Sequence, residues 1–62
     1  MTGPDLRAAL VKLYGEGSDY HLAEAAHADL GASKRSVYAA LAGQPVNVKV
    51  PLETVLRIKG AL

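Results

Sequence analysis

The sequence predicts an all-α protein with four helices and an extended segment before the last one. Leucine, valine and alanine recur at helical spacing in four stretches of the 62-residue chain. Residues typical of helix ends, such as serine, threonine, proline and glycine, flank these stretches. The two-residue period of a strand occurs only at Val46, Val48 and Val50, and no second strand candidate could pair with it. We therefore expect one compact helical domain over residues 1–62.

The first predicted helix begins near Thr2 and ends before Gly15. Thr2 or Gly3 can cap it, and Pro4 fits the first turn, where its missing N–H is not needed. Its apolar stripe is spaced at i, i+4 and i+7 and consists of Leu6, Leu10 and Leu13.

A tight turn at Gly31 joins the second predicted helix to the third. Ser18 can cap the second helix, and its apolar line consists of Leu22, Ala26 and Leu30. Ser33 can cap the third helix, residues 33–42, and Gly43 closes it. Two short helices joined in this way are the signature of a helix-turn-helix unit, in which the second helix can enter the major groove of DNA.

The outer side of the third helix carries side chains suited to nucleic acid. We expect Val37, Ala40 and Leu41 to face inward. Hydroxyl groups, cations and an aromatic ring on the opposite side can contact phosphate, read guanine edges and pack against base methyl groups. The predicted DNA-binding residues are Ser33, Lys34, Arg35, Ser36, Tyr38 and Ala39, with Gln44 and Lys49 near the DNA backbone. An ordinary solvated helix face is the alternative explanation.

The fourth predicted helix begins at Pro51 and runs toward Leu62. Glu53 suits its positive end, and basic residues suit its negative end. Its apolar residues are Leu52, Val55, Leu56, Ile58 and Leu62. The extended segment before it, residues 44–50, is expected to tuck its valines against the core, or else to pair as a short strand with another copy of the chain.

The charge of the chain is close to neutral. Seven Lys and Arg stand against six Asp and Glu, a net charge of +1. Many DNA-binding domains are far more basic, so this balance weakens a nucleic-acid interpretation. After Asp29, however, five charged residues are basic and one is acidic, so the carboxy-terminal half is the basic half.

The composition argues against enzymatic and metal chemistry. The absence of cysteine excludes a thiolate zinc site and a cysteine nucleophile. His21 and His27 would lie about 120° apart around a helix, so one metal ion could not easily bind both. The chain has no glycine-rich phosphate loop and no nucleophile with an identifiable base. We expect no enzyme activity, no metal and no cofactor.

No apolar run reaches the length of a membrane helix, and the amino terminus lacks the features of a signal peptide. We therefore expect a cytoplasmic protein with no membrane partner.

Residues 18–62 resemble the Cro and lambda-repressor type of helix-turn-helix regulator, also described as XRE-like. Gly31, an aliphatic residue six positions later at Val37 and a glycine twelve positions later at Gly43 match the spacing of that family. The tail PLETVLRIKGAL resembles the helix that commonly follows its recognition helix. The chain departs from the family at His27, where alanine is usual, and at Ala32, where a larger aliphatic residue is preferred. The gap before the last helix is longer, and the ending at residue 62 leaves little room for a fifth helix.

This resemblance implies a compact four-helix, lambda-repressor-like domain that regulates transcription in a phage or a bacterium. Such a protein reads double-stranded DNA as a homodimer with helix 33–42, acts most simply as a repressor, and associates with the nucleoid. The resemblance places base-reading positions on Ser33, Lys34, Arg35 and Tyr38, with Gln44 near the backbone. The alternative, favoured by the near-neutral charge, is a small helical protein-interaction module or an antitoxin-like protein that binds a partner.

Overall fold

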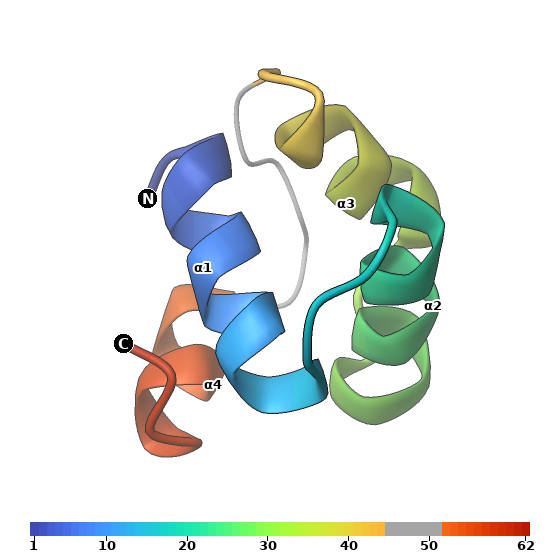
Figure 1. Ribbon diagram of the computed structural model, residues 1–62. Coiled ribbons are helices and arrows are strands. Elements are labelled where there is room, and N and C mark those ends of the chain that lie inside the picture. Colours follow the sequence, from blue (N-terminus) through green and yellow to red (C-terminus); the bar gives the residue numbers. More distant parts are fainter. Residues whose placement is uncertain (45–51) are drawn as a thin grey trace.

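The structure is a computed structural model that describes residues 1–44 and 52–62 (Figure 1). These residues form four helices and no strand, namely α1 (Gly3–Tyr14), α2 (Asp19–Leu30), α3 (Lys34–Leu41) and α4 (Leu52–Ile58). The predicted all-α class is therefore confirmed. The expected helix start at Pro51 and the expected extended segment, apart from Gln44, lie outside the described residues. None of the described helices combines the length and the apolar character needed to cross a membrane.

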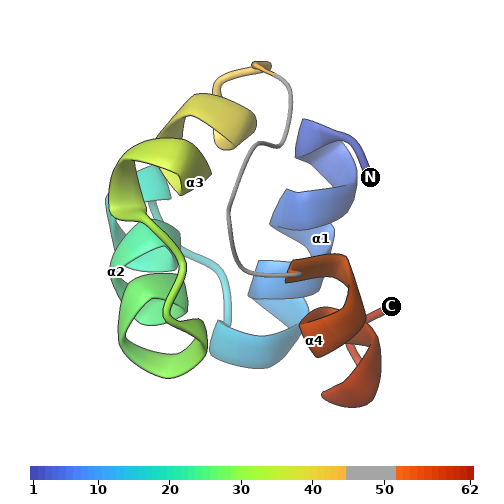
Figure 2. The same cartoon turned by 180° about the vertical axis from the view of Figure 1, so that it is seen from behind.

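The helices are arranged in two pairs. Opposite views show α1 and α4 on one side of the molecule and α2 and α3 on the other (Figures 1 and 2). Helix α1 packs against both α2 and α3, so it connects the two pairs. Both chain ends lie on the side of α1 and α4.

Side-chain caps fix the beginnings of the first three helices. At α1 the Thr2 hydroxyl accepts the Asp5 N–H at 3.3 Å, and the Asp5 carboxylate accepts the Thr2 N–H at 3.1 Å. This reciprocal capping box satisfies two backbone donors that would otherwise lack partners. Ser18 and Ser33 each accept the backbone N–H three residues further on, at 3.2 and 3.4 Å. The predicted caps are confirmed, with Thr2 rather than Gly3 in the first position.

The core consists of leucine, valine and alanine side chains. The largest fully buried ones are Leu6, Leu10, Leu22, Leu56 and Val37. Alanine fills the spaces between helices at positions 9, 23, 26, 32 and 40. Most of the predicted apolar residues of α1 to α3 are buried, and only Leu13 and Leu41 are partly buried.

Two residues predicted to line the apolar face of the last helix are exposed instead. Ile58 is 81% exposed and Leu62 is 48% exposed. Helix α4 ends at Ile58, and Gly60 then adopts a positive φ of 80°. Because the chain turns there, Ala61 rather than Leu62 reaches the core. The prediction that the helix continues to Leu62 was therefore wrong.

The first residue of α1 lies directly against the end of α3. A Cβ atom at Gly3 would overlap the carbonyl oxygen of Ala40. Glycine therefore permits a close backbone approach at this point. This contact was not predicted. It places the carboxy-terminal end of α3 against the first turn of α1.

Candidate nucleic-acid interface

The turn between α2 and α3 is closed by backbone hydrogen bonds. Gly31 lies in the left-handed region, with φ 73° and ψ 14°. Its N–H donates to the His27 carbonyl at 3.2 Å, and the Ala32 N–H donates to the Ala26 carbonyl at 3.4 Å. Left-handed glycine is a common way to end a helix because it carries no Cβ. The closed turn allows Ser33 to cap α3 only two residues later.

Two of the four departures from the pattern of the resembled family lie at this turn. His27 is exposed, and its Nδ1 atom lies 3.0 Å from the Ala32 carbonyl oxygen. Ala26 occupies the buried position of α2 instead. The Ala32 side chain is also fully buried, so only a small side chain is present where α2 and α3 converge.

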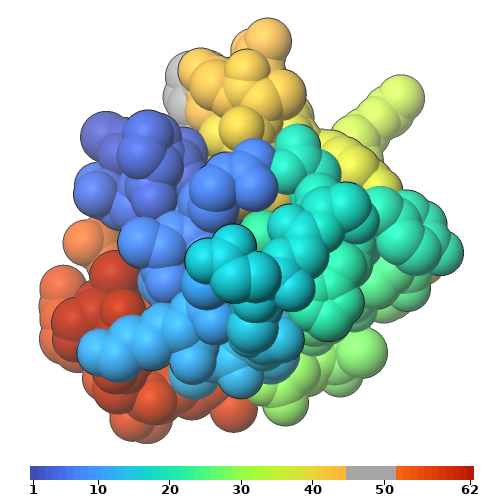
Figure 3. Space-filling model, in the orientation of Figure 1, coloured from blue at the N-terminus to red at the C-terminus, as the bar shows by residue number. Residues whose placement is uncertain are grey.

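Helix α3 presents most of the predicted residues on its outer side. Val37 and Ala40 are fully buried and attach the helix to the core. Ser33, Lys34, Arg35 and Tyr38 are exposed, while Ser36 and Ala39 are half-buried. In the space-filling view, α2 and the beginning of α3 form the edge of the molecule opposite α1 and α4 (Figure 3).

Lys34 forms an ion pair with α2. Its Nζ atom lies 3.0 Å from Oε1 of Glu24. This hydrogen bond is the main cause that lowers the pKa of the Glu24 carboxyl, and it likewise raises the pKa of the Lys34 ammonium group. One of the cations predicted to contact DNA is therefore already paired with a carboxylate of the neighbouring helix.

Arg35 is in a different position from Lys34. No carboxylate of residues 1–44 or 52–62 pairs with its guanidinium group. The remaining pairs of the described chain are Arg7 with Asp19, Arg57 with Glu53, and Lys59 with Asp29. Arg35 is thus the cation of α3 that is available for an external anion.

Two tyrosines border the Lys34–Glu24 pair. Tyr20 is 63% exposed and Tyr38 is 36% exposed. Partial burial is the largest cause that raises the pKa of Tyr38, and the nearby negative charges of α2 raise it further. We call Tyr20, Glu24, Lys34 and Tyr38 the α2–α3 polar cluster.

The sequence contained a signal for this cluster that was not used. Tyr20 and Glu24 are four residues apart on α2, and Lys34 and Tyr38 are four residues apart on α3. Residues at this spacing share one face of a helix. Two such pairs on adjacent helices can meet across the groove between them, which makes Tyr20 and Glu24 candidates for the same surface.

The last two predicted residues follow α3. Gln44 is exposed, and its backbone N–H donates to the Ala39 carbonyl at 2.9 Å. It therefore lies at the opposite end of α3 from Ser33. Lys49 lies outside the described residues.

Each histidine faces a backbone carbonyl. The Nε2 atom of His21 lies 3.2 Å from the backbone carbonyl oxygen of Tyr14. The Nδ1 atom of His27 faces the backbone carbonyl oxygen of Ala32, as described above. Within the described ranges, no three histidine or carboxylate side chains are grouped so that they could hold a metal ion. Both rings are therefore engaged at the turns that join the helices.

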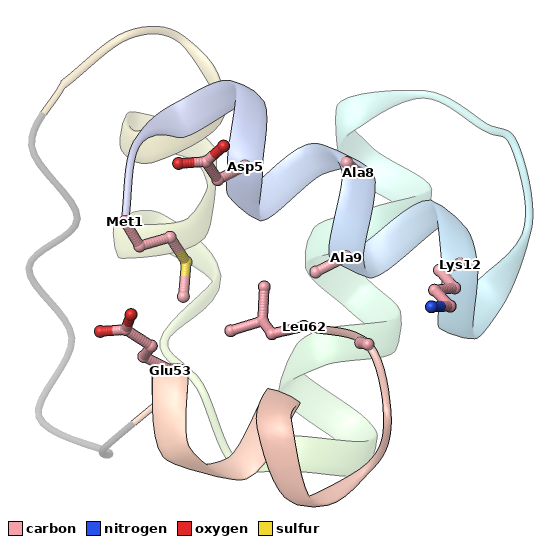
Figure 4. A pocket seen from close by; sticks show the side chains of 8 residues that line it. Met1, Asp5, Ala8, Ala9, Lys12, Glu53 and Leu62 are labelled. Atoms are coloured by element: carbon pink, nitrogen blue, oxygen red, sulfur yellow. The ribbon is translucent and has the colours of Figure 1, made fainter.

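A shallow hollow of about 360 Å³ lies on the side of α1 and α4 (Figure 4). It is lined by Met1, Asp5, Ala8, Ala9, Lys12, Glu53, Ala61 and Leu62. Asp5 already serves in the cap of α1. The hollow contains none of the predicted site residues and lies away from the outer face of α3.

Comparison with known proteins gives no match. No protein-family model matches the sequence, and no similar protein was found among curated proteins or solved structures. What the protein does is therefore inferred from its residues and their geometry.

Proposed function

We propose that the protein is a sequence-specific DNA-binding transcriptional regulator that places α3 in the major groove. The observation that carries this proposal is the geometry of α2 and α3. A left-handed turn at Gly31 joins them, α3 is buried along Val37 and Ala40, and its opposite side is open to solvent. A helix about 10–12 Å across fits the major groove, which is about 12 Å wide. In the lambda-repressor-like domain that the sequence resembles, the second helix of the helix-turn-helix unit, which corresponds to α3 here, binds DNA in this way.

The side chains of α3 have distinct roles in this proposal. The Arg35 guanidinium can donate two hydrogen bonds to the O6 and N7 atoms of guanine. The hydroxyl groups of Ser33 and Ser36 suit phosphate contacts, and the ring of Tyr38 suits a thymine methyl group or a sugar. Phosphate contacts position the protein, and Arg35 supplies sequence discrimination.

A single short recognition helix contacts few base pairs, so we propose that a homodimer binds two half-sites. The half-sites would be separated by about 34–36 Å, one turn of DNA, and related by two-fold symmetry. A phage or bacterial regulator of this kind would repress by occupying a promoter.

The salt dependence of DNA binding tests this function. Binding of a labelled mixed-sequence duplex should weaken steeply with added salt, because phosphate contacts release condensed cations. The variant Lys34→Ala/Arg35→Ala should bind more weakly and with a shallower salt dependence. The matched control is Lys12→Ala/Arg57→Ala, which removes the same charge from α1 and α4. Equal losses in both variants would contradict the assignment of α3 as the DNA-binding helix.

A second candidate function is a helical protein-interaction module. Three described cations of the basic half are already paired with carboxylates, and the large apolar or aromatic side chains of Tyr20 and Ile58 are exposed. Such a surface suits a protein partner better than a polyanion. Absence of salt-sensitive DNA binding by a folded chain would favour this candidate.

A further inference from the structure

Glu24 is the one carboxylate that the structure pairs with the outer face of α3, among the residues it describes. The other described ion pairs involve carboxylates that bind cations outside α3, namely Asp19 with Arg7, Asp29 with Lys59, and Glu53 with Arg57. Glu24 instead reaches across from α2 to Lys34. The proposed DNA-binding face therefore contains a fixed negative charge beside one of its two described cations.

We propose that Glu24 is a built-in competitor of DNA phosphate for Lys34, and that it thereby lowers the affinity of the α3 face for DNA. This inference rests on the proposed DNA-binding function and deepens it. It assigns to an α2 residue a role in setting affinity at the α3 surface.

The exposure of the pair makes such competition possible. The side chains of Lys34 and Glu24 are 45% and 39% exposed, so water and an incoming phosphate can reach both. Exposed ion pairs are weak, because water screens them and two long side chains must be held in one geometry. A phosphate can therefore displace the carboxylate from Lys34.

The displaced carboxylate remains anchored nearby. Helix α2 is fixed to the core by Leu22, Ala23 and Ala26, all fully buried, so the Glu24 backbone cannot move away from α3. A negative charge held beside the bound phosphate opposes binding. The same carboxylate also removes part of the positive field that attracts DNA before contact.

The variant Glu24→Gln tests the inference with little change in shape. We expect it to bind a labelled mixed-sequence duplex about two- to fivefold more tightly than wild type at low salt, the range set by a weak exposed pair. The slope of log affinity against log salt should become steeper by up to about one unit, because Lys34 then contributes its full charge.

Two controls separate the local effect from the change in net charge. Glu53→Gln alters the net charge equally but lies on α4, where its partner is Arg57. It should tighten binding less than Glu24→Gln does. In a Lys34→Gln background, Glu24→Gln should lose most of its effect, since the group for which it competes is gone. Circular dichroism of each variant establishes that the helices are retained.

The outcomes distinguish this inference from the function on which it rests. If Glu24→Gln and Glu53→Gln act equally, or if the effect of Glu24→Gln persists without Lys34, Glu24 is not a competitor for Lys34. The proposed function would still stand in that case, provided that wild type binds DNA and Lys34→Ala/Arg35→Ala binds it more weakly and with a shallower salt dependence. If wild type shows no salt-sensitive binding to DNA, the proposed function and the role of Glu24 are both overturned.

Discussion

Asp29 connects three parts of the chain. Its Oδ2 atom accepts the Tyr14 hydroxyl of α1 at 2.7 Å and lies 3.4 Å from the Lys59 ammonium that follows α4. The hydrogen bond from Tyr14, followed by that from Lys59, lowers the pKa of Asp29 below the ordinary value of 3.8. Burial and the same carboxylate raise the pKa of Tyr14.

This contact predicts an acid dependence of stability. A carboxyl group with a lowered pKa in the folded state stabilises the fold above its unfolded pKa, and this contribution is lost as the pH falls through the folded pKa. The free energy of unfolding of wild type should therefore decrease below about pH 4. Asp29→Asn should show a smaller decrease over the same range, measured by urea unfolding at a series of pH values. An identical pH dependence in the two proteins would contradict the contact.

At the residue scale the sequence predicted which side of α3 is exposed but not what its side chains contact. Helical periodicity alone placed Val37 and Ala40 inside and Lys34, Arg35 and Tyr38 outside. The pairing of Lys34 with Glu24 depends on the distance between two helices and on the rotamers of two long side chains. Neither quantity is encoded in the local spacing of residues, so Lys34 could be predicted only as a cation on an outer face.

At the scale of elements, the turn at Gly31 determines where α3 points. Its φ of 73° is costly for an L-residue, and a Cβ atom at this position would meet nothing within 4 Å. The effect of a substitution is therefore one of backbone conformation and not of crowding. Gly31→Ala should lower the free energy of unfolding by about 1–2 kcal/mol, measured by urea denaturation.

Because a chain of 62 residues can be made by chemical synthesis, a single D-amino acid can be placed at position 31 as a control. D-Alanine at position 31 favours the positive φ that L-alanine resists. It should restore the stability of the glycine protein or exceed it, because it also restricts the unfolded chain. A loss of stability with both alanine enantiomers would show that Gly31 does not adopt the left-handed conformation.

Helix α4 offers a second test at this scale. Leu56 is fully buried and Ile58 is 81% exposed, although they are only two residues apart. Leu56→Ala should lower the free energy of unfolding by about 2–5 kcal/mol, a large part of the roughly 3–9 kcal/mol expected for a domain of this length. Ile58→Ala should change it by less than about 0.5 kcal/mol. Equal effects in thermal or urea unfolding would contradict the docking of α4 through Leu56.

The sequence predicted the elements well where capping residues were clear. Thr2, Ser18 and Ser33 marked three helix starts, and glycines marked the ends. The end of α4 was harder to predict because Ile58, Gly60 and Leu62 fit both a continuing helix and a turn. The close approach of Gly3 to Ala40 could not be predicted, since it depends on how α1 crosses α3.

At the scale of the whole molecule, the class of fold could be predicted because helical periodicity runs through nearly the entire chain. The arrangement of the helices in two pairs comes from packing between distant segments, which periodicity does not specify. Three of the positive charges of the basic half are also balanced by ion pairs at this scale. Carboxylates of α2 and α4 neutralise Lys34, Arg57 and Lys59, so the basic half of the sequence does not produce a uniformly basic surface.

Selection from a pool of random duplex DNA at physiological salt tests the central claim most directly. Wild type and Lys34→Ala/Arg35→Ala would be used in parallel, and the recovered sequences read. We predict that wild type enriches an inverted repeat with half-sites about one helical turn apart, and that the variant does not. Failure of folded wild type to enrich any sequence, or recovery of the same repeat by the variant, would contradict sequence-specific DNA recognition by α3.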